Sequence, residues 1–457
     1  MATPAAIRET VEYRVVMVQR DSRKTLALNI LGHYCLPRVR IPQFARPAQE
    51  LRRAIQTTWG LDIFVLDIEF AESGIAPYAS AELLPLGRHP DFEEVLLSEI
   101  LHSELSEKER AEIAKLLDGT SEIPLTRVGW IYQAIAWVES TTGRAFSTKR
   151  HLAQFNAGKG FALLGLRSDD GKQYWLKAAS EPNAHEASIT LLLSNICGGY
   201  LPKTIASKPE WNAWLMTGDG DSIADLPAQP LALSRLLEKA VASMAEIQLK
   251  TIGRELELLE AGAFDQRLDV LSAHAEALFE YLGEAMSQQT STKVAPIGKR
   301  RIRELREVFA RVCSQLEKLA LPNSVVHGDI NLSNILITSR NCQFIDWSEA
   351  YVGNPLSSLQ HLLLLNRVED GELKSSIARE LKNKYRAAMS SRCDPAVIET
   401  AFVYMPFWAA CSTLYGRGSW LTRLSRDHPH RKTFARTVGR YIDRAASDPV
   451  LLDALTG

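Results

Sequence analysis

The sequence predicts an α+β fold in which a small β-rich lobe precedes a large helical lobe, with a separate α/β domain in front of both. Three observations support this prediction. Apolar residues recur at helical spacing through most of residues 231–321. Short apolar runs separated by polar turns, typical of strands, occur before that region, at 161–178 and 211–216. The pattern of residues 1–118 fits neither lobe, so we expect these residues to form a domain of their own.

The 457-residue chain divides into four predicted segments. Its length suits about two to four domains or lobes, and an apolar content of 46% is enough for complete hydrophobic cores. Turn-forming residues favour a linker directly after position 118. We therefore predict a first domain at 1–118, a linker at 119–130, a small lobe at 131–219 and a large lobe at 220–457.

Within the first domain, apolar runs at 15–18 and 26–28 predict a β-hairpin. A helix is expected from Ala48 up to the Gly60-Leu61 step, followed by a strand at 63–66. The charged amphipathic stretch from 97 to 117 is predicted to be one further helix.

This order of elements, together with the Leu36-Pro37 step before the helix, resembles a Nudix domain. In that family, glutamates of the signature bind Mg²⁺ for diphosphate hydrolysis. The matching positions here lack carboxylates: Ala45, Ala54, Thr57 and Thr58. The resemblance therefore implies a domain that does not hydrolyse and instead serves binding, packing or dimerisation, so that a homo-oligomer could form through it. An unrelated α/β domain is the alternative.

The most informative segment of the chain starts at His327. Gly328 and Asp329 follow it directly, Asn334 comes five residues after Asp329, and Asp346 follows the next pair of apolar runs. Short strands are expected to hold these polar groups near one point. Phosphoryl transfer needs a positioned acceptor hydroxyl and Mg²⁺ on the phosphates.

A carboxylate and an amide oxygen are suitable ligands for Mg²⁺, so Asn334 and Asp346 are the predicted metal ligands. Asp329 is the predicted catalytic residue, which accepts the proton of the acceptor hydroxyl or orients it. His327 is expected to support the loop by hydrogen bonding. Simple turn and strand-end roles are the alternative for Asp329, Asn334 and Asp346.

These residues resemble the aminoglycoside phosphotransferase family, the small-molecule branch of the protein-kinase-like fold, which has His-Gly-Asp where protein kinases have His-Arg-Asp. The resemblance implies a bilobal protein-kinase-like fold, ATP or GTP as phosphoryl donor with Mg²⁺, and a small-molecule hydroxyl as acceptor. The family's usual Gly-Asp-Pro is Gly-Asn-Pro here, at 353–355, so substrate contacts do not carry over.

The small lobe should supply a lysine for the nucleotide phosphates. Lys177 lies in the second strand of a predicted hairpin, and Glu186 begins a helical pattern. The resemblance implies that the two form the kinase ion pair. The alternatives are an exposed strand lysine and a glutamate favoured by the helix dipole.

Two further nucleotide contacts are expected. Gly158 and Gly160 lie in a turn that could fold over the phosphates, although an ordinary glycine turn fits as well. By resemblance, Met216 and Thr217 are placed at the hinge, where backbone groups would bind adenine.

Two other function classes stay open: a non-catalytic nucleotide-binding scaffold and a transferase that moves another part of the nucleotide. A net charge of −1 argues against general nucleic-acid binding. Six scattered cysteines favour reduced thiols in a cytoplasmic protein. No apolar run reaches the length of about 18 residues that a membrane span needs, so no membrane partner is expected.

Overall fold

The computed structural model describes residues 9–20, 22–43, 45–69, 76–84, 90–146, 152–218, 220–226, 229–419 and 429–456. The chain forms two compact units. The first consists of Met1–Ala187 and Lys203–Gly218, and the second of Ser188–Pro202 and Asp219–Gly457.

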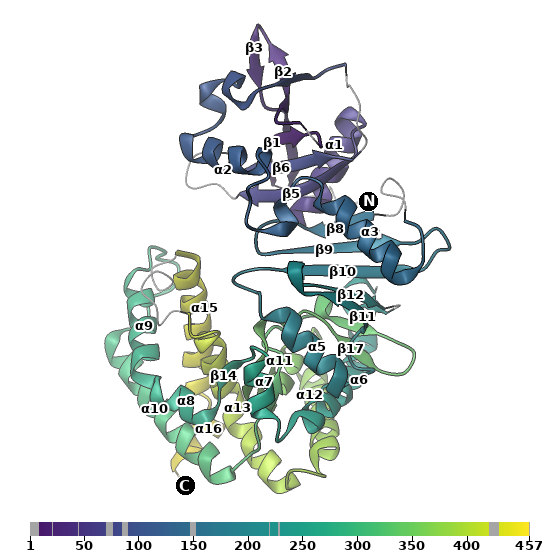
Figure 1. Cartoon of the computed structure of the whole chain (residues 1–457). Coiled ribbons are helices and arrows are strands. Elements are labelled where there is room, and N and C mark those ends of the chain that lie inside the picture. Colours follow the sequence, from purple (N-terminus) through teal and green to yellow (C-terminus); the bar gives the residue numbers. More distant parts are fainter. Residues whose placement is uncertain are drawn as a thin grey trace, which may run out of the picture. The chain divides into compact units, whose positions relative to one another are not determined.

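The first unit begins with a mixed seven-stranded sheet (Figure 1). Its central order is β3-β2-β1-β6-β5, with β4 paired to β1 and β7 to β2. β1 and β6 run parallel, and the remaining pairs are antiparallel. The predicted hairpin is confirmed, since Met17 of β1 pairs with Leu26 of β2. The strands are β1 (Thr10–Val18), β2 (Thr25–Ile30), β3 (His33–Cys35), β4 (Arg38–Pro42), β5 (Ile63–Glu69), β6 (Tyr78–Leu83) and β7 (Glu93–Val95).

Helix α1 (Pro47–Trp59) packs on one face of this sheet. It ends at Gly60, whose φ of +68° is the left-handed conformation that glycine adopts without strain. The predicted helix and the strand after it, β5, are therefore confirmed. The predicted helix from 97 to 117 is partly wrong. α2 (Glu107–Leu117) starts only where Ser106 and Glu109 form a capping box, and two 3₁₀ turns, Leu97–Glu99 and His102–Glu104, precede it.

The other face of the sheet shares one hydrophobic core with the small lobe. Val16 and Val18 of β1 point to this side because side chains alternate along a strand. Leu164 and Leu176 of the second sheet lie in the same core. The predicted linker contributes as well: its Leu125 is buried, and α3 (Trp130–Thr142) follows it into the core. The segment 119–130 is thus packed, not an exposed connection.

The second sheet is antiparallel, with the order β11-β12-β10-β9-β8. The predicted hairpin at 161–178 is confirmed as β9 and β10, and the predicted run at 211–216 forms β12 after a 3₁₀ turn. α5 begins at Glu186, as predicted. The elements are β8 (Leu152–Asn156), β9 (Phe161–Arg167), β10 (Gln173–Ala179), α5 (Glu186–Ile196), β11 (Lys203–Lys208), the 3₁₀ turn Pro209–Trp211 and β12 (Ala213–Thr217).

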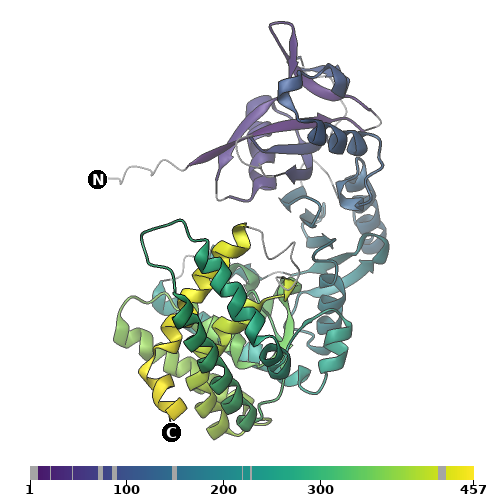
Figure 2. The same ribbon diagram turned by 90° about the vertical axis from the view of Figure 1, so that its left-hand side faces the viewer.

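The second unit is mainly helical, as the periodicity predicts, and Figure 2 shows its helices from the side. α15 packs against α9 and α13, and α10 against α9. The helices are α6 (Pro230–Thr251), α7 (Glu255–Glu260), α8 (Leu268–Ala273), α9 (Ala275–Ser287), α10 (Lys299–Leu319), α11 (Leu356–Leu364), α12 (Gly371–Met389), α13 (Pro395–Tyr415), α15 (Pro429–Ala446) and α16 (Pro449–Thr456).

Two small three-stranded sheets complete the second unit. Their orders are β13-β16-β17 and β14-β18-β15. Together they frame the segment that carries the predicted catalytic residues. The strands are β13 (Asp221–Ser222), β14 (Phe264–Gln266), β15 (Ser324–Val326), β16 (Ile335–Ile337), β17 (Cys342–Phe344) and β18 (Tyr351–Gly353).

α13 corrects one expectation from the sequence. Among the described residues it is the helix whose length and composition would allow a membrane crossing, with a mean hydropathy of 1.3 over its most apolar stretch. Polar residues such as Glu399 interrupt the apolar residues of this helix, so it is not one continuous apolar run. In the structure 61% of that stretch is buried, and Trp408 stacks on Phe309 of α10. These contacts are those of a core helix.

Candidate active site

The predicted catalytic loop joins the two small sheets of the second unit. It leaves β15 at Val326, forms a 3₁₀ turn at Leu332–Asn334 and continues into β16. β16 and β17 form the predicted hairpin, with Ile335 opposite Phe344. β15 is fully buried, whereas Asp329 is exposed. The loop therefore exposes the Asp329 carboxylate to solvent, while the strand that precedes it is anchored in the core.

Two asparagines fix the position of the Asp329 side chain. Asn334 Nδ2 donates to the Asp329 main-chain oxygen at 2.9 Å and to its Oδ2 at 3.2 Å. Asn331 Nδ2 lies 3.4 Å from Oδ1 and 3.3 Å from Oδ2. Because both amide nitrogens face Asp329, the Asn334 side-chain oxygen points away from that carboxylate. An amide oxygen with this orientation is suitable as a metal ligand.

Asp346 follows β17 with a φ of +68°, which is uncommon for a residue other than glycine. Ser348 Oγ donates to its Oδ1 at 3.1 Å. Ile345, the preceding residue, donates its N–H to the Asn334 carbonyl at 3.1 Å, so the segments that carry the two predicted metal ligands are hydrogen-bonded to each other. Strained backbone of this kind persists where the surrounding structure holds a functional group in place.

The donor set fits Mg²⁺. In the described part of the chain, no group of three or more His, Cys, Asp or Glu side chains could hold a metal by itself. Mg²⁺ is usually bound through one or two protein oxygens together with water and substrate phosphates. Asn334 and Asp346 supply such oxygens, which suits an ion that arrives with a nucleotide.

His327 connects the catalytic loop to the segment before Asp346. Its Nε2 lies 2.9 Å from the Ile345 carbonyl, and its ring packs against Trp347 with centroids 4.5 Å apart. The side chain is fully buried, and this burial lowers the pKa of His327. A neutral ring with Nε2–H as donor is the form that suits a carbonyl acceptor. These contacts are those of a loop support.

Gly328 is required by close packing. Its φ is +79°, and a Cβ placed there would lie 2.0 Å from the carbonyl oxygen of Glu349. Glu349 follows Asp346 by three residues, and its carboxylate is bound by Arg417, whose Nε lies 2.9 Å from both carboxylate oxygens. Arg417 also donates to the Ser348 carbonyl at 3.2 Å. The predicted catalytic and metal-binding segments are thus in direct contact at Gly328.

His361 on α11 gives a testable pH dependence. Burial lowers its pKa to about 4, and Nε2 lies 3.3 Å from Thr413 Oγ1. Between about pH 6.5 and 4 the unfolded chain binds a proton that the folded state does not, so stability falls as the pH falls through this window. We expect protonation of His361 to lower the free energy of unfolding by about 2 kcal/mol between pH 7.5 and pH 4.5. Urea unfolding at both pH values, compared with His361→Gln, measures this loss. An equal loss in the variant would contradict it.

The first unit contains a buried ion pair. Lys177 of β10 lies 2.5 Å from Glu186 at the start of α5, with side chains 8% and 2% exposed. Lys177 Nζ also lies over the rings of Phe161, at 5.5 Å, and Trp214, at 5.9 Å. The exposed lysine considered from the sequence is therefore wrong, whereas Glu186 does begin a helix, where the helix dipole also favours it. Its role toward nucleotide stays a prediction.

Lys177→Met is expected to destabilise the first unit by about 3–5 kcal/mol, because Glu186 loses the ammonium that offsets its burial. Thermal unfolding measures the effect. Lys172→Met, at an exposed position in the turn before β10, is the matched control and should unfold like the wild type. The double variant Lys177→Met/Glu186→Leu should recover most of the loss. A single variant as stable as wild type would show that the pair contributes nothing.

The other predicted nucleotide residues also lie in the first unit. Gly158 has a φ of +129°, and a Cβ there would lie 3.3 Å from Asp67 Oδ1 of β5. Gly160 accepts a hydrogen bond from the Ser180 N–H at 2.8 Å. The glycine turn thus packs against the first domain, a contact that the sequence analysis missed. Met216 and Thr217 end β12, where Met216 pairs with Trp175.

Sequence reasoning also missed Asn331 and the Arg417–Glu349 pair. Asn331 has a local signal: its Oδ1 accepts from the N–H groups of Ser333 and Asn334, at 2.9 and 3.2 Å, which is the Asx-turn geometry that asparagine favours. Arg417 is 68 residues from Glu349 and gives no local signal.

Residues 167–390 match the model of the phosphotransferase enzyme family. A search of curated proteins finds no match. Among solved structures, a macrolide 2′-phosphotransferase from Brachybacterium faecium is 17% identical, with 67% of this chain and 96% of that chain covered and a TM-score of 0.43.

Two further solved structures are similar to this chain. A choline/ethanolamine kinase family protein from Mesorhizobium loti is 14% identical over 72% of this chain and 99% of that chain, with a TM-score of 0.43. A variant aminoglycoside 2′-phosphotransferase in its GDP complex is 13% identical over 69% and 97%, with a TM-score of 0.41. The family match spans Lys177, Asp329, Asn334 and Asp346.

Proposed function

We propose that the protein transfers the γ-phosphoryl group of ATP or GTP to a hydroxyl group of a small molecule. The observation that carries this proposal is the geometry of Asp329. Its carboxylate is exposed, two side-chain amide groups hold it in place, and the strand that leads into its loop is buried. The family match supports phosphoryl transfer, and GDP in the structure of a similar protein is consistent with a nucleotide donor.

In the proposed mechanism, Asp329 accepts the hydrogen bond of the acceptor hydroxyl and takes its proton as the oxygen attacks phosphorus. Asn331 and Asn334 keep the carboxylate oriented, so no side-chain rearrangement is needed during transfer. Asn334 and Asp346 would hold Mg²⁺, which neutralises negative charge on the phosphates. Lys177, fixed by Glu186, is proposed to contact the nucleotide phosphates.

The direct test is transfer of ³²P from γ-labelled ATP and GTP to a panel of macrolides, aminoglycosides, amino alcohols and sugars in the presence of Mg²⁺. Labelling of one acceptor, absent in the Asp329→Asn protein, is expected. Nucleotide affinity is measured on the same preparations by calorimetry. Absence of both labelling and nucleotide binding would favour the non-catalytic scaffold instead.

Asp346→Asn is expected to raise the Mg²⁺ concentration for half-maximal activity by about 10- to 100-fold. This is the loss of affinity that follows when one interaction with a charged group is weakened. The substitution keeps the shape of the side chain and removes its charge. Asp453→Asn makes the same change at an exposed position on α16 and serves as the control. An unchanged Mg²⁺ dependence in Asp346→Asn would contradict its assignment as a ligand.

We further propose that residues 1–118 have a Nudix-like fold without its hydrolytic chemistry. The order of β4, α1 and β5, with the helix ending at Gly60, supports the fold. Three of the eroded signature positions lie on α1 itself, where Ala54, Thr57 and Thr58 offer no carboxylate. The shared core with the five-stranded sheet supports a packing role for this domain.

A further inference from the structure

A cavity of about 440 Å³ lies in the second unit, between α15 and the loop that follows α9. This volume falls in the range of small-molecule sites, roughly 300–1,000 Å³. Three arginines line the cavity at intervals of four residues along α15, which places them on one face of the helix: Arg436, Arg440 and Arg444. Among the described residues, no aspartate or glutamate lines it. The wall of the cavity is therefore positively charged.

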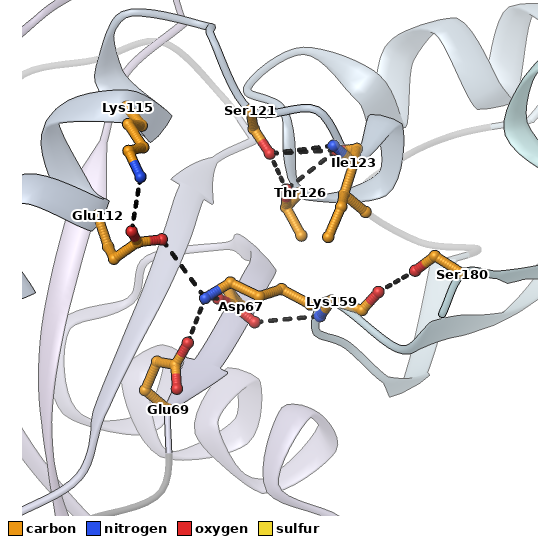
Figure 3. A network of polar contacts seen from close by, with 9 residues as sticks. All are labelled: Asp67, Glu69, Glu112, Lys115, Ser121, Ile123, Thr126, Lys159 and Ser180. Atoms are coloured by element: carbon orange, nitrogen blue, oxygen red, sulfur yellow. Dashed lines mark hydrogen bonds and ion pairs between the residues drawn. The ribbon is translucent and has the colours of Figure 1, made fainter. Parts of the chain in front are cut away.

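The carboxylates of the neighbouring helices do not neutralise these arginines. Asp443, the acidic residue of α15, pairs with Arg301 of α10 at 2.6 Å. The three glutamates of α9 line a different groove, which α9 forms with α10. By contrast, Lys159 of the first unit is surrounded by three carboxylates (Figure 3). Like charges four residues apart on a helix repel each other, so an anion bound between the arginines would stabilise this face of α15.

Hydrogen bonds hold two of the arginines in place and leave donors over. Arg436 donates to the Ala285 carbonyl at 3.1 Å and to Thr433 Oγ1 at 2.9 Å, so its charge lies at the C-terminal end of α9, where the helix dipole favours it. Arg440 donates to the Arg436 carbonyl at 3.1 Å and to Gln289 Oε1 at 2.6 Å. A guanidinium group has five N–H donors, so Arg440 is fixed in position and can still bind a ligand.

The loop opposite α15 is fixed by the same glutamine. Gln289 Nε2 donates to the carbonyl groups of Ser291 and Val294, at 2.7 and 2.6 Å. Because its Oε1 accepts from Arg440, one side chain sets both the loop and the guanidinium group. The cavity is therefore formed before any ligand enters, which lowers the entropy that binding would cost.

Apolar surface lies beside the arginines. Tyr441 is 55% exposed and Val294 is 56% exposed, and both line the cavity. The guanidinium group of Arg444 lies over the Tyr441 ring, 5.7 Å from its centre. These groups are independent of the charge pattern, and they suit a ligand that has an organic part as well as a negative charge.

We propose that this cavity binds a soluble phosphate monoester with an apolar organic group. Its phosphate would lie between Arg440 and Arg444, and its organic group would pack against Tyr441 and Val294. Arginine binds phosphate oxygens through paired N–H donors, and the two negative charges of a monoester match two guanidinium groups one helical turn apart. The proposal does not depend on phosphotransferase activity, since binding can be measured without nucleotide or Mg²⁺.

Calorimetric titration at pH 8 with phenyl phosphate, inorganic phosphate and phenol tests the proposal, because the last two each lack one half of the first. Phenyl phosphate should bind saturably, inorganic phosphate about tenfold more weakly, and phenol not measurably. Arg440→Gln and Arg444→Gln should each weaken phenyl phosphate binding about tenfold or more. Tyr441→Ala should weaken phenyl phosphate more than inorganic phosphate. Arg311→Gln, at an exposed position on α10, is the matched control and should bind like the wild type.

Asp329→Asn separates this cavity from the proposed acceptor site and should also bind phenyl phosphate like the wild type. The proposal is overturned by absence of saturable phenyl phosphate binding, by equal affinity for phenol, or by wild-type affinity in both Arg440→Gln and Arg444→Gln. Loss of binding in Asp329→Asn alone would place the phosphate at the catalytic loop and also overturn it.

A lipid headgroup carries the same phosphate chemistry, and sedimentation with vesicles of phosphatidylcholine and phosphatidic acid distinguishes it. Sedimentation with these vesicles in place of saturable titration would indicate a membrane surface and overturn the soluble ligand. Arg444 is exposed, so Arg444→Gln tests the cavity if Arg440→Gln unfolds. Thermal unfolding of each variant checks its fold.

Discussion

Asp329→Asn is expected to lower kcat by about 10²- to 10⁴-fold, the usual contribution of a positioned acid or base. The amide cannot take up the proton of the acceptor hydroxyl, although it occupies the same space. Nucleotide affinity should change little, because the predicted metal ligands are Asn334 and Asp346. Phosphoryl transfer and calorimetric nucleotide binding, measured on the same preparations, provide the two values.

Ser333→Ala is the matched control for this variant. Ser333 lies in the 3₁₀ turn of the same loop and is exposed like Asp329, but only its backbone N–H takes part in the hydrogen bonds of the turn. We expect its kcat to equal that of the wild type. If Asp329→Asn retained full turnover, Asp329 would not be the catalytic base. The role of the loop would then be limited to binding of nucleotide or acceptor.

Gly328→Ala should abolish most activity and lower stability by about 1–3 kcal/mol. Its Cβ would lie 2.0 Å from the Glu349 carbonyl oxygen, a main-chain atom that cannot rotate away. Either the catalytic loop or the segment that carries Asp346 must therefore move. A displacement of about 1 Å is enough to cost about 10²-fold in rate. Turnover and thermal unfolding measure the two effects.

Gly253→Ala separates the clash from backbone strain. Gly253 has a φ of +80°, nearly identical to the +79° of Gly328, but a Cβ there would meet no atom within 4 Å. This variant should be destabilised by about 1 kcal/mol and keep its kcat. Equal loss of activity in both variants would show that the strain of a positive φ, and not the contact with Glu349, explains the effect.

The hydrogen bonds of the loop that carries Asp329 could be predicted because its geometry is local. Asp329 and Asn334 are five residues apart and are joined by one turn, which Asn331 stabilises through its own backbone contacts. Lys177 and Glu186 are nine residues apart, at the end of a strand and the start of the next helix. Hydrogen bonds within such short segments follow from residue type and spacing, so motif reasoning reaches them.

The start of α2 was placed ten residues too early, because apolar periodicity does not register the capping box of Ser106 and Glu109, although that box is a local sequence signal.

Long-range contacts, in contrast, could not be predicted from local patterns. For the glycine turn the sequence indicated a nucleotide contact or an ordinary turn, whereas in the structure Lys159 of this turn binds Glu69, 90 residues away. Such contacts depend on which surfaces of the folded chain pack together, and a local sequence pattern does not indicate this.

By itself, the sequence determined which residues form the loop with Asp329 and Asn334, the hairpin with Lys177 and most helices, because backbone hydrogen bonding and apolar periodicity act over a few residues. Only the tertiary structure decided that Gly328 touches Glu349, that Arg417 holds that segment, and that the first domain shares a core with the five-stranded sheet. The physical reason is that packing and charge pairing between distant segments depend on the whole fold, since each contact requires surfaces that other parts of the chain bring together.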